Sequence, residues 1–140
     1  MPGFILTDTA AAPVEDVWKL LFDPSRFPEW WAGIETVRVG AEGALTVWQY
    51  GYPDFPLPQN LRADPATGRV TMSCQTFDVE VSWQLAEQGE DTRITVTADI
   101  PADLADLVGV LEREVAAASL TALVRLAEAE HALSRSPRSR

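Results

Sequence analysis

The chain has 140 residues, a length that suits one domain with a single hydrophobic core. Its formal net charge is −10, from 21 acidic and 11 basic residues, so it repels phosphate backbones and is a poor candidate for binding nucleic acid. The single cysteine, Cys74, excludes an internal disulfide, and with only one histidine, His131, the usual zinc sites cannot be assembled.

The apolar content argues for an ordinary globular protein. Hydrophobic residues make up 46% of the chain, but no apolar run approaches the roughly 20 residues of a membrane-spanning helix. The N-terminus has no basic segment followed by a long apolar stretch, as a secretory signal would. We therefore expect no membrane span and a cytoplasmic location.

The N-terminal part predicts one strand and two short helices. Residues 3–9 are expected to form the strand, and Pro13 suits the first turn of a helix that Asp23 and Pro24 end. Residues 25–30 are expected to form a second, shorter helical piece. The apolar residues that recur with helical period in the first helix are Val14, Val17, Trp18, Leu21 and Phe22.

Residues 34–100 change to a period of two, which is typical of strands. Turn signals at residues 40–43, 64–68, 75–78 and 88–89, with the proline-rich stretch 51–58, divide this part into six strands. We expect residues 51–58 to form a semi-rigid loop, because proline is unsuited to a central strand. The loop has two aromatic residues, Tyr52 and Phe55, whose side chains we expect to be exposed, and the family resemblance described below implies that they flank the entrance to a cavity.

The last third predicts one long amphipathic helix over residues 101–133. Gly109 lies inside it and costs about 1 kcal/mol relative to alanine, which suggests close approach or bending. We expect it to face the sheet or the cavity mouth. Residues 134–140 are basic and are expected to be a disordered tail. The apolar stripe of the helix is Leu104, Val108, Leu111, Val115, Ala118, Ala122 and Leu126.

The order of elements indicates an α+β fold in one domain over residues 1–133. A strand, two helices, six strands and a final helix give a seven-stranded curved antiparallel sheet wrapped around a long C-terminal helix. A sheet with one apolar face cannot leave that face bare, so the final helix must cover it.

Turn lengths predict which side chains face inward, because paired residues of an antiparallel ladder point the same way. A turn at residues 88–89 pairs Leu85 with Thr92, Trp83 with Ile94, Val81 with Val96 and Val79 with Ala98. Turns further back pair Met72 with Val81 and Leu61 with Met72, which sends Arg62 outward. A turn at residues 40–43 pairs Val39 with Ala44, Val37 with Thr46 and Glu35 with Trp48, and so places Trp48 and Tyr50 inside.

The residues predicted to bind a ligand come from three places: this inner face, the final helix and the aromatic residues at the entrance. For any one of them, ordinary core packing is the main alternative. Acidic pairs such as Glu112 and Glu114 are expected on solvent faces. The predicted site consists of Trp31, Val37, Trp48, Tyr50, Tyr52, Phe55, Leu61, Met72, Cys74, Val81, Trp83, Ile94, Val96, Leu104, Val108 and Leu111, with Val39 on the same inner face.

Two segments resemble a known family. Residues 11–31, Ala-Ala-Pro-Val-Glu-Asp-Val-Trp-Lys-Leu-Leu-Phe-Asp-Pro-Ser-Arg-Phe-Pro-Glu-Trp-Trp, resemble the start of the polyketide cyclase/dehydrase proteins of the START/Bet v 1-like (SRPBCC) superfamily. Residues 118–128, Ala-Ser-Leu-Thr-Ala-Leu-Val-Arg-Leu-Ala-Glu, resemble that family's C-terminal helix. The resemblance implies a helix-grip fold whose cavity holds hydrophobic molecules such as aromatic polyketides, sterols, lipids or quinones.

The resemblance leaves three functions open, because this superfamily includes carriers, enzymes and co-chaperones. The first is binding of a hydrophobic or aromatic small molecule, by a monomer or homodimer. The second is a polyketide cyclase, aromatase or dehydratase that needs no metal or cofactor, in which Tyr50 protonates or orients a carbonyl. The third is a co-chaperone-like module that binds a polypeptide, which a filled cavity would favour.

Overall fold

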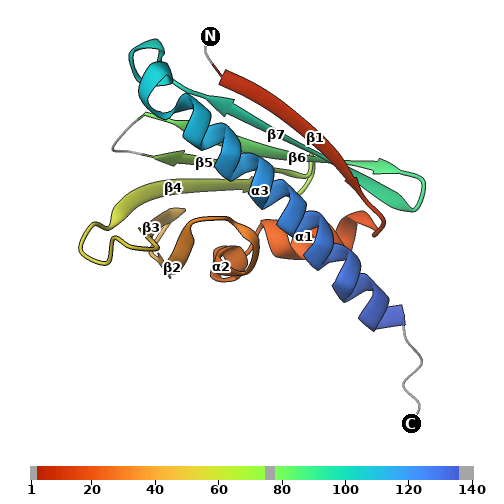
Figure 1. Cartoon of the computed structure of the whole chain (residues 1–140). Coiled ribbons are helices and arrows are strands. Elements are labelled where there is room, and N and C mark those ends of the chain that lie inside the picture. The colour runs from red at the N-terminus through yellow and green to blue at the C-terminus, as the bar shows by residue number, and fades with distance from the viewer. Residues whose placement is uncertain (1–2, 75–77, 136–140) are drawn as a thin grey trace.

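The structure is a computed structural model that describes residues 3–74 and 78–135, and its architecture is the predicted α+β helix-grip fold. The predicted order of elements is confirmed (Figure 1). The elements are β1 (Gly3–Ala10), α1 (Val14–Leu21), the 3-10 turn η1 (Pro24–Arg26), α2 (Phe27–Trp30), β2 (Ile34–Val39), β3 (Ala44–Gln49), β4 (Leu57–Asp64), β5 (Arg69–Cys74), β6 (Glu80–Gln88), β7 (Asp91–Asp99) and α3 (Ala102–Arg135).

Three predicted boundaries can be compared with these elements. The proline-rich loop ends earlier than expected, because Leu57 and Pro58 already belong to β4. Pro58 is tolerated there because it is only the second residue of the strand. Of the predicted tail, residues 134 and 135 continue α3 and residues 136–140 lie outside the described residues, as do residues 75–77 of the predicted turn at 75–78.

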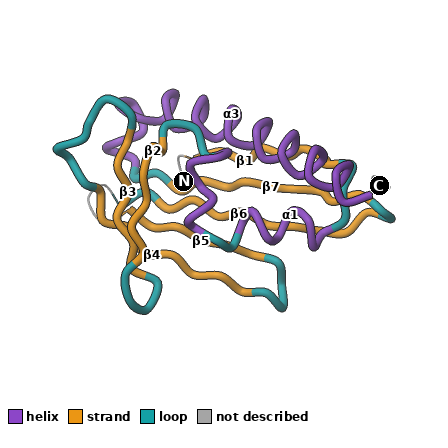
Figure 2. Tube along the Cα trace, turned by 90° about the horizontal axis from the view of Figure 1, so that it is seen from below, coloured by secondary structure: helices purple, strands orange, loops and turns teal. Residues whose placement is uncertain are grey.

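The seven strands form one sheet in the order β1-β7-β6-β5-β4-β3-β2, and every neighbouring pair is antiparallel. The sheet is strongly curved, and α3 crosses it diagonally with α1 and α2 below (Figure 1). The view from below shows α3 running alongside β1 while β2, β3 and β4 gather at the opposite end of the sheet (Figure 2). None of the helices in the described part of the chain is long and apolar enough to cross a membrane.

The predicted faces of β4 to β7 are confirmed. Met72 pairs with Val81 and with Leu61, as expected. The pairs between β6 and β7 are displaced by two residues from those predicted, because the turn is at residues 89–90, so that Trp83 pairs with Val96. A shift of two keeps every side chain on its face.

The predicted register of β2 and β3 is wrong. Val39 pairs with Leu45 and Val37 with Val47, which is one residue away from the prediction, and a bulge lies between Ile34 and Thr36. The connecting turn is one residue longer than expected, and a side chain at Gly43 (φ +84°) would come within 2.5 Å of the backbone oxygen of Leu61. A shift of one residue exchanges the two faces of a strand.

A cluster of four aromatic side chains joins α2 to the sheet. Trp30 and Trp31 stack on each other with 5.2 Å between ring centroids, and each meets Trp83 of β6 edge to face at 5.1 and 5.5 Å. Phe27, at the start of α2, contacts the rings of both Trp30 and Trp31. The chain leaves the helix at Trp31, whose ψ of 109° is extended, so the rings of both adjacent tryptophans reach the same partner.

The buried face of α3 differs from the predicted stripe. Ala118 is exposed, and the fully packed positions are Ala116, Ser119, Leu120, Leu123 and Ala127. The predicted stripe used seven-residue steps, such as 104, 111 and 118, and a straight helix drifts by about 20° with each such step. The C-terminal half of α3 therefore packs through a face rotated from the one predicted.

Gly109 does not approach another element. A Cβ built there would meet no described atom within 4 Å outside its own stretch of helix. The expectation of close approach is therefore wrong, and the glycine weakens the N-terminal half of α3 without a packing reason.

Charged groups tie the C-terminal end of α3 to the helices below it. The Arg26 guanidinium donates two hydrogen bonds to Glu29 at 2.7 and 2.9 Å and two more to Glu130 of α3. These bonds hold the pKa of both carboxyls below the ordinary value. His131 Nδ1 lies 2.8 Å from Oδ2 of Asp16 in α1. Glu130 therefore links the C-terminal end of α3 to Arg26 and Lys19.

Ser119 makes the polar link between the middle of α3 and the segment after α2. Its Oγ accepts a hydrogen bond from the backbone N–H of Ala32 at 2.8 Å and donates to the carbonyl of Val115 at 2.6 Å. The side chain is completely buried. Because a buried donor that loses its partner is costly, this hydroxyl fixes the distance between α3 and the Trp31 segment.

We predict that Ser119→Ala lowers the free energy of unfolding by about 1–3 kcal/mol, because the N–H of Ala32 loses its acceptor. Urea denaturation measures the change. Thr121→Ala, at an exposed position of the same helix, is the matched control and should leave stability nearly unchanged. Equal effects of the two substitutions would contradict the assignment of Ser119 as a structural link.

Candidate ligand-binding cavity

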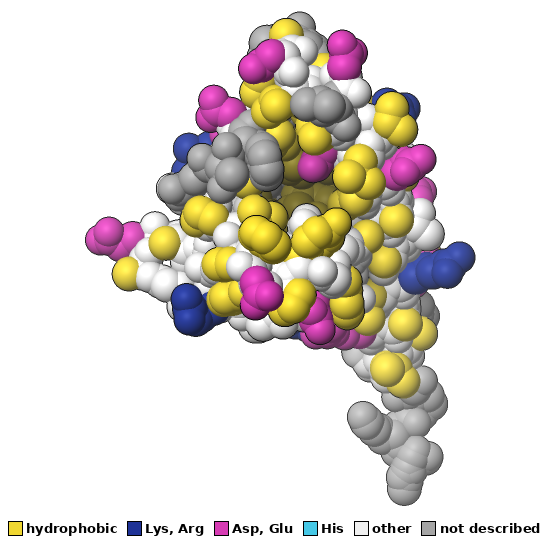
Figure 3. All heavy atoms as spheres, turned by 60° about the vertical axis from the view of Figure 1, so that its left-hand side comes forward, with side chains coloured by type: hydrophobic (Ala, Val, Ile, Leu, Met, Phe, Trp, Pro, Cys, Tyr) yellow, Lys and Arg dark blue, Asp and Glu magenta, His cyan; other side chains and the backbone are white. Residues whose placement is uncertain are grey.

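A cavity of about 250 Å³ lies between the N-terminal half of α3 and the strands β3 to β6. Figure 3, in which the left-hand side of the Figure 1 view comes forward, shows a hollow surrounded mainly by hydrophobic side chains. Trp31 and Trp83 of the aromatic cluster form part of its wall. The lining consists of Trp31, Ala32, Ile34, Val47, Gln49, Leu57, Gln59, Met72, Cys74, Val79, Val81, Trp83, Val108, Leu111, Glu112, Val115 and Ala116.

Seven of the residues predicted for ligand binding are brought together in this lining. They come from the segment after α2, from β5 and β6, and from α3. These residues are Trp31, Met72, Cys74, Val81, Trp83, Val108 and Leu111. Leu111 is also largely exposed, which places it at the rim of the cavity.

Five other predicted residues pack into the protein interior away from the lining. Ile94 and Val96 are fully buried in the main core, where Val37 and Leu61 pack against the same cluster. Leu104 packs beside Ile100 in a smaller cluster at the start of α3. For these positions the structure supports ordinary core packing.

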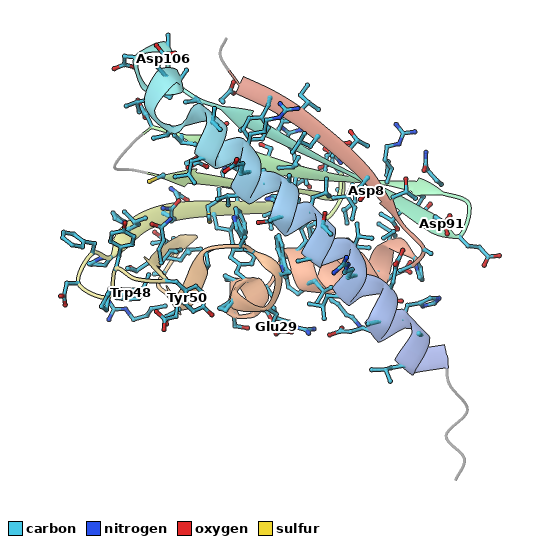
Figure 4. All side chains as sticks on the ribbon, viewed as in Figure 1. Asp8, Glu29, Trp48, Tyr50, Asp91 and Asp106 are labelled. Atoms are coloured by element: carbon cyan, nitrogen blue, oxygen red, sulfur yellow. The ribbon has the colours of Figure 1, made fainter. Side chains whose placement is uncertain are left out.

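The four predicted aromatic residues of β3 and the following loop lie outside the cavity. Tyr50 is 61% exposed, and Tyr52 and Phe55 are similarly exposed and contact each other edge to face. Trp48 is half-buried beneath the guanidinium of Arg38, and Figure 4 shows Trp48 and Tyr50 on the outer side of the hairpin. Placing Trp48 and Tyr50 inside was wrong because of the one-residue register error in β3. Val39 pairs with the buried Leu45, and its own side chain is exposed at the end of β2.

Sequence reasoning missed the other lining residues for identifiable reasons. Ile34, Val47 and Gln49 enter the lining once the β2–β3 register is corrected. Glu112 lies four residues after Val108 and four before Ala116, so helical spacing alone places it on the cavity side of α3. Leu57, Gln59 and Ala32 were also missed, whereas Val79 and Val115 were predicted to face inward without being assigned to the site.

Polar groups in the cavity have unused hydrogen-bonding capacity. Gln59 is 6% exposed, and its amide has no side-chain hydrogen bond within the described part of the chain. The indole Nε1 of Trp83 is buried and has no partner among the described residues. A ligand with an oxygen or nitrogen atom could satisfy such groups.

Glu112 is the charged side chain of the lining. Burial raises the pKa of its carboxyl above the ordinary value, because the ionised form loses contact with water. No hydrogen bond or ion pair connects this carboxyl to another described residue. The lining includes no lysine, arginine or histidine.

The same cavity has no arrangement typical of a metal centre. Within residues 3–74 and 78–135, no group of three or more histidine, cysteine, aspartate or glutamate side chains could hold a metal ion. The titratable side chains of the lining are Cys74 and Glu112. Besides apolar and aromatic contacts, the described lining thus offers hydrogen-bonding groups and one carboxyl, that of Glu112.

Comparison with known proteins gives a family model and several solved structures. The model described as polyketide cyclase/dehydrase and lipid transport matches residues 4–129. No curated protein matches the chain in sequence.

The similar structures share the fold at low sequence identity. The Zhui aromatase/cyclase from Streptomyces sp. R1128 is 18% identical, with a TM-score of 0.75 over 90% of this chain and 93% of that chain. A protein from Thermobifida fusca is 22% identical, with a TM-score of 0.71 over 94% and 97%. A START superfamily protein from Mycobacterium smegmatis is 17% identical, with a TM-score of 0.70 over 94% and 98%.

We predict that Glu112→Gln stabilises the protein at pH 8 and leaves its stability unchanged at pH 3. In the unfolded chain the carboxyl has its ordinary pKa, and in the folded chain the pKa is higher. Folding therefore favours the protonated form, and the native protein loses stability as the pH rises from the ordinary pKa through the folded one. Glutamine cannot ionise and removes this loss.

Melting temperatures measured across this pH range test the prediction. Glu114→Gln removes the same charge at an exposed position of the same helix and is the control for the effect of net charge. A stability difference between the two variants that does not change with pH would contradict the burial of an ionisable Glu112.

Proposed function

Because the chain belongs to the polyketide cyclase/dehydrase and lipid transport family, we propose that it binds a compact hydrophobic or aromatic small molecule in the cavity beneath α3. The observation that carries the proposal is the cavity itself, which has a largely apolar lining and remains unfilled by the chain. An apolar ligand would gain about 25 cal/mol for each Å² of apolar surface that it removes from water.

The walls of the cavity favour a flat ligand. Trp31 and Trp83 present two large ring systems in an edge-to-face arrangement, and Met72 adds a polarisable side chain. An aromatic ligand can meet these rings in the offset or edge-to-face geometries that aromatic pairs prefer. Methionine adapts to ligands of different outline.

The size of the cavity limits the ligand. Its volume of about 250 Å³ lies just below the roughly 300–1,000 Å³ usual for pockets that hold drug-sized molecules. A compact molecule of a few rings, or a short alkyl chain, fits this space better than a sterol or a long polyketide. Movement of the exposed Leu111 at the rim could enlarge it.

The two other functions considered from the sequence have less support. The cyclase hypothesis relied on Tyr50, which lies at the surface, and the lining contains no tyrosine. The co-chaperone hypothesis would be favoured by a filled interior, whereas the space beneath α3 is open. Binding of a small molecule uses the cavity as it stands.

We predict that Val81→Phe weakens the binding of the neutral probe 2-naphthalenemethanol by about tenfold or more, which is about 1.4 kcal/mol. Val81 lines the cavity, and a phenylalanine there would occupy space that the ligand needs. Isothermal titration calorimetry gives the two dissociation constants.

The matched control is Val39→Phe, the same substitution at an exposed position of β2. It should leave the affinity unchanged. A probe that binds the native protein and Val81→Phe equally well would place the binding site elsewhere, and a probe that binds neither would contradict the proposed function for naphthalene-sized ligands.

A further inference from the structure

Resting on the proposed function, we propose that the cavity selects hydrophobic amines, with the ligand's ammonium group paired to the carboxylate of Glu112, and rejects hydrophobic carboxylates. The proposal assigns a charge preference to the site. It follows from the position of one acidic side chain and from the charges that the lining lacks.

Glu112 is directed at the cavity by the geometry of α3. Val108 and Ala116, one helical turn before and after it, both line the same space. Side chains separated by four residues share one face of a helix, so the carboxyl belongs to the face that covers the ligand. A ligand in this cavity therefore lies against Glu112.

The carboxyl of Glu112 has no hydrogen-bond or ion-pair partner among residues 3–74 and 78–135. The next residue, Arg113, holds its guanidinium over the ring of Phe4, 5.7 Å from the centroid, and makes no ion pair with Glu112. Elsewhere this chain does pair its half-buried acids, as Arg26 does for Glu130. An unpaired carboxyl that is partly removed from water is the group that a bound cation would stabilise most.

The aromatic wall also suits a cation. Trp31 and Trp83 line the cavity, and tryptophan is the side chain whose ring face attracts cations most strongly. The amide oxygens of Gln49 and Gln59 in the same lining can accept hydrogen bonds from an ammonium group. The donors that an amine carries thus find acceptors here.

An anionic ligand would meet the opposite situation. The lining has no lysine, arginine or histidine to neutralise a carboxylate, and it places a second carboxyl beside it. The formal net charge of −10 adds a long-range field that attracts cations and repels anions. Hydrophobic acids are therefore expected to bind more weakly than neutral molecules of the same shape.

Three probes with the same ring system test the charge preference by calorimetry at pH 8. They are 2-naphthylmethylamine, which is protonated at this pH, 2-naphthalenemethanol, which is neutral, and 2-naphthoate, which is anionic. We expect the amine to bind about tenfold more tightly than the alcohol, and the alcohol more tightly than the carboxylate.

Two charge-matched variants separate the local contact from the overall field. Glu112→Gln should remove most of the amine's advantage over the alcohol, measured as the ratio of their two dissociation constants for the same variant. Glu114→Gln, at an exposed position of α3, removes the same formal charge and should retain the preference. Circular dichroism establishes that both variants are folded.

The outcomes that overturn this inference differ from those that overturn the proposed function. If the alcohol binds but the amine binds no better, or if both variants reduce amine binding equally, the pairing with Glu112 is wrong and hydrophobic binding stands. If the amine alone fails to bind, the inference is also wrong. If none of the three probes binds, the proposed function itself fails.

Discussion

The arrangement of the whole molecule depends on the contact between two adjacent tryptophans and the sheet. Trp30, the last residue of α2, and Trp31, which follows it, stack on each other, and both meet the same ring, that of Trp83 on β6. This contact fixes the two short helices against the middle strands of the sheet. It also divides the interior, because the large rings fill the space on one side and form a wall of the cavity on the other. The position of the ligand site is thus set by core packing.

The two halves of α3 have different structural roles because they lie on opposite sides of the wall formed by Trp31 and Trp83. The C-terminal half is closely packed through Leu120 and Leu123, and it is fixed by ion pairs that converge on Glu130. The N-terminal half covers the cavity, includes the loosely surrounded Gly109 and exposes Val110 and Leu111. The C-terminal half of α3 is therefore firmly attached to the rest of the protein, whereas the N-terminal half covers the cavity and has few neighbours. Glu112, the charged residue of the lining, lies in the N-terminal half.

The sequence was sufficient to predict the fold, because alternation of apolar residues and the proline and glycine turn signals act locally. It was also sufficient for the half of the site built on β5 and β6, whose register was predicted correctly. The two-residue error between β6 and β7 left Trp83 and Val81 on the correct face. It was insufficient for β3, since the length of one turn decides whether Val47 or Trp48 points inward. Glu112 was missed because acidic residues are usually solvated, although its spacing of four residues from Val108 already places it on the same face of the helix.

The separation of the interior into a closely packed part and a part that contains the cavity also affects how such a protein can evolve. Side chains that face the cavity from α3, such as Val108 and Glu112, have space on one side, so their replacement disturbs few neighbours. A substitution there can change the size or charge of the preferred ligand while the aromatic cluster continues to hold the fold together. Selection can therefore act on ligand choice almost independently of folding, and a small stability margin is enough to allow new specificities to be explored.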